Sequence, residues 1–197
     1  MEYRTLGSTG IKVSLLGLGT MGFDDVKRKD TYTDLIKKSI DKGINYFDTS
    51  EAYSGNLSEE LLGYSLQKLQ IPRENIVLST KIFYGKGFGH PHSNHQINSL
   101  GLSRKHIIES TKISLKKLQT DYVDVVFCHR YDTETPLEET CRAMNWLIEN
   151  GQALYWGTCE WDTEQIIKAI DICEKLDLIP PAVEQIQYNF LDRYLKS

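Results

Sequence analysis

Four titratable side chains stand at or just beyond the carboxyl ends of apolar runs that are typical of buried strands: Asp48, Tyr53, Lys81 and His129. Folds built from alternating strands and helices place their chemistry at this edge of the sheet. An acid, a phenol, an ammonium group and an imidazole that converge there would form a proton-transfer site. Each residue also fits a structural role by itself, such as helix capping by Asp48 or an ion pair between His129 and Asp132.

The chain alternates short apolar runs with longer helical patterns, which predicts βαβ units and a parallel sheet. The interval between the third and fourth runs is the longest, so we expect an insertion of roughly 17 residues within residues 82–102. Ahead of the first run, residues 3–6 and 12–15 flank a glycine-rich turn and predict a β-hairpin. The six predicted strands begin near Leu15, Ile44, Asn75, Tyr122, Ala153 and Val183.

Capping residues predict where four of the helices begin or end. One helix should end at Gly43, and another should begin directly after Ser103. A third should begin at Asp162, with Gln165 completing a capping box, and a fourth should have Thr135 as its N-cap.

The composition is that of one globular domain spanning residues 1–197, with 40% hydrophobic residues to form a core. The net charge of −4 and the scattered basic residues give no electrostatic footprint for nucleic acid or for an anionic membrane. No apolar run approaches the length needed to cross a bilayer. We therefore expect a cytoplasmic protein without direct membrane insertion.

The histidines and cysteines do not favour a metal site. The four cysteines show neither a C-x-x-C pair nor zinc-ligand spacing, which predicts reduced, structural thiols. His90, His92 and His95 lie within residues 82–102, where no carboxylate or cysteine could complete a ligand set. We predict no metal site. We expect this segment to be a substrate loop that covers the end of the fold where the four titratable side chains lie.

Four motifs together resemble the aldo-keto reductases: residues 17–20 (GLGT), 47–53 (FDTSEAY), 79–81 (STK) and 129–132 (HRYD). Three further segments are most similar to the branch of that superfamily that contains voltage-gated potassium channel β subunits: residues 101–109, 122–127 and 155–158.

The resemblance implies an α/β fold of the (β/α)₈ TIM-barrel family with an NADP(H) site at its C-terminal face. Such a barrel needs about 250 residues. Only six of its strands can be counted before Ser197, so we expect an incomplete barrel that lacks its C-terminal units.

The resemblance also implies which residues bind the cofactor. Gln185 matches the family glutamine that contacts the nicotinamide carboxamide. Met21 replaces a tryptophan of the channel-subunit branch, and Cys159 with Glu160 replaces a serine followed by asparagine or arginine. A thiol and an ionised carboxylate are poorer hydrogen-bond partners for this purpose. The full implied set is Gly19, Thr20, Met21, Asp48, Cys159, Glu160 and Gln185.

These residues suggest NADPH-dependent reduction of a small aldehyde or ketone to an alcohol. A carbonyl that accepts hydride develops charge on its oxygen and needs a proton donor, which we assign to Tyr53. A phenol has an ordinary pKa of about 10, so a cation must stabilise its ionised form, and Lys81 would supply that cation. Asp48 would orient Lys81, and His129 would orient the carbonyl.

Two other hypotheses stay open at this point. The protein could be a cofactor-binding regulatory β subunit that docks, as a homotetramer, on a voltage-gated potassium channel. It could also be an inactive truncated product. Many channel subunits of the resembling branch have asparagine at the position of His129, so the histidine favours an enzyme.

Overall fold

The computed structural model describes residues 1–85 and 97–191 of the chain. In this part of the chain a parallel sheet of six strands forms the centre, and the strands lie side by side in chain order. All six strands that the sequence predicts are confirmed. They are β3 (Gly17–Gly19), β4 (Tyr46–Asp48), β5 (Val77–Ile82), β6 (Val123–Cys128), β7 (Ala153–Cys159) and β8 (Val183–Gln185).

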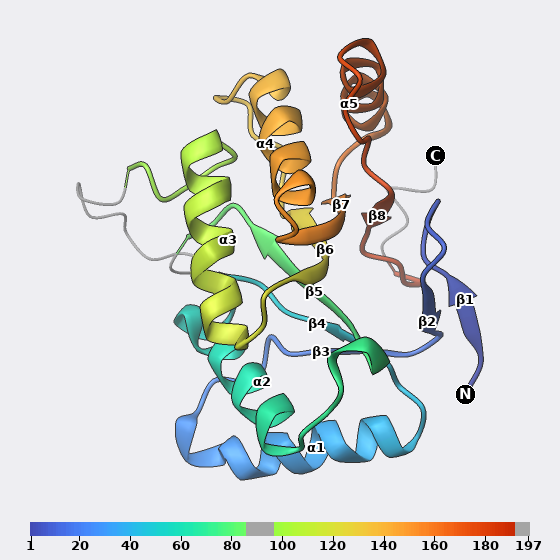
Figure 1. Cartoon of the computed structure of the whole chain (residues 1–197), viewed down its shortest axis with the longest axis vertical. Coiled ribbons are helices and arrows are strands. Elements are labelled where there is room, and N and C mark those ends of the chain that lie inside the picture. Colours follow the sequence, from blue (N-terminus) through green and yellow to red (C-terminus); the bar gives the residue numbers. More distant parts are fainter. Residues whose placement is uncertain (86–96, 192–197) are drawn as a thin grey trace.

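Five α-helices of the described residues connect these strands and cover the outside of the sheet (Figure 1). Each helix packs against the next one along the chain. Every residue of β5 and β6 is buried, as expected for parallel strands that are covered on both faces. The helices are α1 (Lys29–Asp41), α2 (Leu57–Lys68), α3 (Arg104–Leu118), α4 (Leu137–Glu149) and α5 (Thr163–Lys175).

The predicted β-hairpin is confirmed, and it lies at the amino ends of the parallel strands. The N–H of Ser14 donates to Asn45 Oδ1 at 2.7 Å, and the N–H of Ser8 donates to the carbonyl of Ala182 at 3.0 Å. Asn45 and Ala182 directly precede β4 and β8, so the hairpin leaves the carboxyl edge of the sheet free. Its strands are β1 (Tyr3–Thr5) and β2 (Lys12–Ser14).

Three of the four predicted helix boundaries are confirmed. Ser103 Oγ accepts a hydrogen bond from the N–H of His106 at 3.2 Å, and Asp162 and Gln165 form the reciprocal capping box. Gly43 follows α1 with a φ of +86°, a conformation that a residue without Cβ adopts at no steric cost.

The N-cap prediction for Thr135 is wrong. Helix α4 begins two residues later, and the Thr135 hydroxyl donates to Asp132 Oδ2 at 2.7 Å. As an N-cap, the Thr135 hydroxyl would accept a hydrogen bond from a backbone N–H of the first turn. Here it donates instead to the Asp132 carboxylate, a charged acceptor three residues earlier in the chain.

Helix α2 has no counterpart among the predictions. Asn56 precedes it with a left-handed φ of 73° and makes no capping hydrogen bond with its side chain. The usual sequence signal for a helix start is therefore absent, and tertiary packing of the helix takes its place.

The connection between β5 and β6 is the longest between consecutive parallel strands, in agreement with the predicted insertion. Its central part, including His90, His92 and His95, lies outside the described residues, and so does the substrate loop predicted there. Within the described residues, no three side chains of His, Cys, Asp or Glu are grouped so that they could hold a metal ion.

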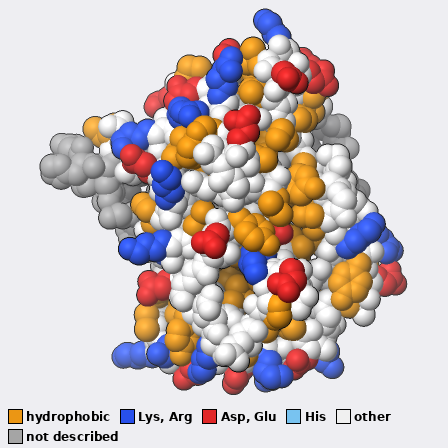
Figure 2. Space-filling model, in the orientation of Figure 1, with side chains coloured by type: hydrophobic (Ala, Val, Ile, Leu, Met, Phe, Trp, Pro, Cys, Tyr) orange, Lys and Arg blue, Asp and Glu red, His pale blue; other side chains and the backbone are white. Residues whose placement is uncertain are grey.

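The surface carries charges of both signs. On the face shown in Figure 2, Lys and Arg are interspersed with Asp and Glu, and no extended basic patch is visible. Among the helices of the described residues, none is long and apolar enough to span a membrane.

Candidate active site

Asp48 and Lys81 form a buried ion pair at the carboxyl ends of β4 and β5. The Lys81 side chain is fully buried, and its Nζ donates to Asp48 Oδ2 and, at 3.0 Å, to the carbonyl of Thr49. The other carboxylate oxygen of Asp48 accepts a 2.6 Å hydrogen bond from Ser79 Oγ. These contacts hold the ammonium in one position, which an ion pair exposed to water would not do.

Tyr53 lies against this ion pair. Lys81 Nζ stands 4.9 Å from the centroid of the Tyr53 ring. Tyr53 begins a short 3₁₀ turn, and the next three residues take positive φ values of 53°, 64° and 73°, which reverse the chain directly after the phenol. Ser54-Gly55-Asn56 favours such a turn.

The pKa of Tyr53 is raised from 10.0, first by burial and then by the charge of Asp48. The Lys81 charge acts in the opposite direction and does not outweigh them. The phenol is therefore protonated at neutral pH, which is the form that donates a proton.

His129 follows β6 and faces Tyr53. The two rings meet edge to face with 5.8 Å between their centroids, and Tyr84 meets His129 from another side at 5.1 Å. His129 Nδ1 lies 3.2 Å from Ser50 Oγ. Burial, followed by the charges of Lys81 and Arg130, lowers the pKa of His129 to about 3, so the imidazole is neutral. Ser50 and Tyr84 are neighbours that sequence reasoning missed.

The alternative pairing of His129 with Asp132 is not what the structure shows. Asp132 accepts instead from the N–H of Leu102 at 2.7 Å and from Thr135, and so ties the segment after β6 to the segment before α3.

Apart from Asp48, the residues assigned to the cofactor by resemblance lie at the carboxyl ends of three other strands, β3, β7 and β8. Gly19 ends β3 and pairs in register with Asp48. The Thr20 hydroxyl is buried against Ser58 Oγ at 2.7 Å, so this side chain supports the site from behind. Met21 is 65% exposed beside the site.

Cys159, Glu160 and Gln185 come together at the ends of β7 and β8. The Cys159 thiol donates to Gln185 Oε1 at 3.8 Å, and the N–H of Glu160 donates to the Gln185 carbonyl at 3.1 Å. Glu160 itself has a left-handed φ of 58°, and its carboxylate accepts from the N–H of Gln187. Burial raises the pKa of Cys159 to about 11, so this thiol is a neutral donor.

Arg130 is a further residue that sequence reasoning did not single out. Its guanidinium donates to the His129 carbonyl and, at 3.3 Å, to Cys159 Sγ. The charge therefore links the β6 end, which carries His129, with the β7 end. Its place directly after His129 is the only signal in the sequence.

We expect Lys81→Met to destabilise the protein by about 3–5 kcal/mol, because Asp48 would keep a largely buried carboxylate without its cation. Urea unfolding of the complete gene product measures this loss. Lys68→Met is the matched control, since Lys68 pairs with Asp30 at the surface and its removal should hardly move the midpoint. Equal shifts for the two variants would contradict the structural role of the buried pair.

The family of the chain follows from comparison with known proteins. A model of the Aldo/keto reductase family matches residues 15–197, which include all six parallel strands and the site at their carboxyl ends. The chain belongs to the aldo/keto reductase family. A crystal structure of a thermostable aldo-keto reductase in complex with the inhibitor epalrestat resembles it with a TM-score of 0.82 at 32% sequence identity. That match covers 98% of this chain and 65% of the other. The predicted TIM-barrel class, with six of its strands present, is thereby confirmed.

Two relatives from plants are described as "Probable voltage-gated potassium channel subunit beta". They come from Arabidopsis thaliana and Oryza sativa subsp. japonica, and each is 46% identical to this aldo/keto reductase over 198 residues. Each match covers 98% of this chain and 57% of the relative. The chain thus spans little more than half the length of these curated relatives, and its predicted similarity to the channel-subunit branch is confirmed.

Proposed function

We propose that the complete gene product reduces aldehydes or ketones with NADPH, and that residues 1–197 belong to its cytoplasmic oxidoreductase domain. The observation that supports this most is the fully buried Lys81 ammonium, which touches Asp48 on one side and the Tyr53 ring on the other. A structural ion pair does not need a partly exposed phenol against it, whereas a site that donates a proton to a substrate needs such a group within reach of the substrate.

The residues present fit a nicotinamide cofactor. Gln185 has a carboxamide that both donates and accepts, and the neutral Cys159 thiol lies beside it. Gly19, Met21 and Glu160 stand around the same edge and complete the proposed set with Thr20 and Asp48. When bound, the cofactor would supply hydride to the carbonyl carbon.

The side chains of the protein would then donate the proton that the carbonyl oxygen needs. Tyr53 gives its hydroxyl proton to the carbonyl oxygen as charge develops there, and Lys81 stabilises the phenolate that is left. When Ser50 Oγ donates to His129 Nδ1, the proton of the neutral imidazole resides on Nε2, from which it can donate to the same carbonyl oxygen. Asp48 keeps Lys81 charged and in place.

The direct test follows NADPH oxidation by the complete gene product over a panel of aliphatic and aromatic aldehydes and ketones, with NADH alongside. We expect saturable turnover of at least one aldehyde. If no carbonyl accelerates NADPH oxidation although the protein binds NADPH, the proposal is wrong.

The pH dependence of kcat gives a separate prediction. Because the pKa of Tyr53 is raised, the rate of reduction should fall only above the ordinary phenol value of 10.0, where the donor form is lost. Lys81→Met should shift this decline to still higher pH, since the Lys81 charge opposes the rise. His129, with a pKa of about 3, should add no step near 6.5. A series of buffers at constant ionic strength measures the profile, and a step near 6.5 that His129→Asn removes would contradict the neutral imidazole.

A second candidate function is that of a regulatory channel subunit, because both plant relatives carry that description at 46% identity. Here the protein would form a homotetramer and bind the cytoplasmic side of a potassium channel. Co-expression with a potassium channel, followed by current recording and copurification, tests this. Channel regulation that survives Tyr53→Phe, together with absence of turnover, would favour it over the reductase.

A further inference from the structure

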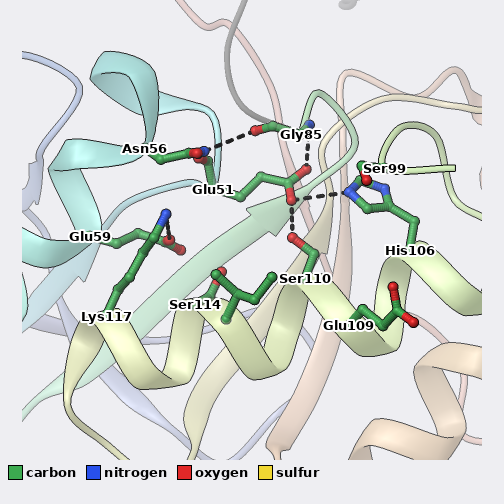
Figure 3. A pocket seen from close by; sticks show the side chains of 11 residues that line it. Glu51, Asn56, Glu59, Gly85, Ser99, His106, Glu109, Ser110, Ser114 and Lys117 are labelled. Atoms are coloured by element: carbon green, nitrogen blue, oxygen red, sulfur yellow. Dashed lines mark hydrogen bonds and ion pairs between the residues drawn. The ribbon is translucent and has the colours of Figure 1, made fainter. Parts of the chain in front are cut away.

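A second cluster of polar groups lies behind the candidate active site, around a cavity of about 110 Å³ between α2 and α3 (Figure 3). Glu51 reaches into it from the segment after β4, and His106 and Ser110 reach toward Glu51 from α3. Glu59 and Lys117 line the opposite end. Glu51 is only 3% exposed, so the position of its carboxylate is set by the groups that surround it.

The Glu51 carboxylate holds the segment that follows β5. Its Oε1 accepts from the N–H of Phe83 at 2.7 Å and from the N–H of Gly85 at 2.9 Å. Asn56 strengthens the same junction, because its Nδ2 donates both to the Glu51 carbonyl and to the Gly85 carbonyl. The hydrogen bonds from these two backbone N–H groups to a carboxylate oxygen are charge-assisted, and such bonds are stronger than those between neutral groups.

The other carboxylate oxygen is anchored to α3. Glu51 Oε2 accepts from Ser110 Oγ and lies 3.3 Å from His106 Nε2. His106 Nδ1 lies 2.8 Å from the carbonyl of Gly101, so both ring nitrogens face acceptors and both act as donors when the imidazole is charged. Burial opposes that charge, but the hydrogen bond and charge of Glu51 overcome it and raise the pKa of His106.

The segment held by Glu51 carries a residue of the candidate active site. Tyr84 lies between the two backbone donors, and its ring packs edge to face on His129. The N–H of Glu51 also donates to the Lys81 carbonyl at 3.2 Å. Glu51, which is not one of the four proposed catalytic residues, therefore connects α3 to the segment whose Tyr84 ring packs on His129.

We propose that Glu51 is a positioning residue for carbonyl reduction: by binding the N–H groups of Phe83 and Gly85, it keeps Tyr84 against His129 and so fixes the orientation of the imidazole. This inference rests on the proposed reductase function. Glu51 touches neither substrate nor cofactor in this scheme and acts only through Tyr84.

The test compares Glu51→Ala and Glu51→Gln with Glu59→Ala in the complete gene product. Glutamine keeps an oxygen for the two backbone donors, whereas alanine frees both. Glu59→Ala removes another buried carboxylate from the same cavity, but Glu59 bonds Thr80 and not the segment after β5. We expect Glu51→Ala to lower kcat by about 10- to 100-fold with NADPH affinity unchanged, as misplacement of a catalytic group does. Glu51→Gln should recover most of the loss, and Glu59→Ala should leave kcat near that of the wild type.

A double-mutant cycle of Glu51 and Tyr84 distinguishes a positioning role of Glu51 from a general loss of stability. Tyr84→Ala should reduce kcat to a similar extent, and the double variant with Glu51→Ala should be no slower than either single variant. Additive losses, or equal losses for Glu51→Ala and Glu59→Ala, would overturn the proposal. Glu51→Asp replaces the alanine variant if that protein does not fold, because it keeps the charge but shortens the reach.

Amide hydrogen exchange keeps this inference separable from the reductase proposal. The N–H groups of Phe83 and Gly85 should exchange faster in Glu51→Ala than in the wild type or in Glu51→Gln, and the nitrogen shifts of the His129 ring should change with them. If the wild type has no turnover, the reductase proposal fails, whereas these two measurements still decide whether Glu51 holds the segment. Unchanged exchange in Glu51→Ala would refute the inference whatever the turnover.

Discussion

Tyr53→Phe is expected to lower kcat for carbonyl reduction by about 10²- to 10⁴-fold, the usual contribution of a positioned general acid. The phenyl ring can keep the edge-to-face contact with His129 and the contact with the Lys81 ammonium, so the fold of the site should be preserved. What is lost is the proton that the developing alkoxide needs. KM and NADPH affinity should change little, since the hydroxyl matters most in the transition state.

Steady-state kinetics on the complete gene product measures this effect, with the best aldehyde of the panel as substrate. Tyr122→Phe is the matched control, because Tyr122 directly precedes β6, at the amino end of the sheet, and packs on Arg73. It should turn over like the wild type. A loss of only a few-fold in Tyr53→Phe would transfer the role of proton donor to another group, with His129 as the first alternative.

The 197-residue chain by itself is expected to unfold without cooperativity and to show no saturable NADPH binding. Within the described residues β3 and β8 are the two ends of the sheet, and each has a strand on one side only. Open strand edges pair with other chains and promote aggregation. Apolar side chains that follow β8 in the chain are exposed, with Phe190 at 92% and Leu191 at 99%.

The free energy of unfolding leads to the same expectation. Domain stability is only about 5–15 kcal/mol, and each large apolar side chain that stays in water forgoes about 1.5–3 kcal/mol of burial. A few such side chains are enough to bring the stability near zero. Differential scanning calorimetry and fluorescence titration with NADPH measure both expectations, with the complete gene product as the reference. A sharp transition together with micromolar NADPH affinity would contradict them and would imply that self-association or a partner chain covers the open edges.

Local patterns in the sequence were enough to predict the architecture. Alternating apolar runs and helical patterns predict a parallel sheet, and the side chain that follows each strand must then stand at the common carboxyl edge. For this reason the order of residues along the chain is enough to place Asp48, Lys81 and His129 together. Capping boxes are equally local, because Asp162 and Gln165 meet within one helical turn.

Tertiary structure decided what depends on residues far apart in the chain. The Asp132 carboxylate accepts from the N–H of Leu102, which lies thirty residues away, and Thr135 donates to the same oxygen instead of capping α4. Helix α2 begins without a capping side chain at Asn56. The pKa of Tyr53 rises because burial and Asp48 outweigh Lys81, a balance set by distances and desolvation that no motif encodes.

The sequence by itself thus determined the order of the strands, the family and the four residues of the proposed proton-transfer site, because these follow from short-range patterns and the geometry of parallel strands. Only the tertiary structure revealed the contact of Ser50 with His129, the link from Arg130 to Cys159 and the hold of Glu51 on the segment around Tyr84. Each of these contacts joins separate elements. Their partners are chosen by packing in three dimensions and leave no regular spacing in the chain.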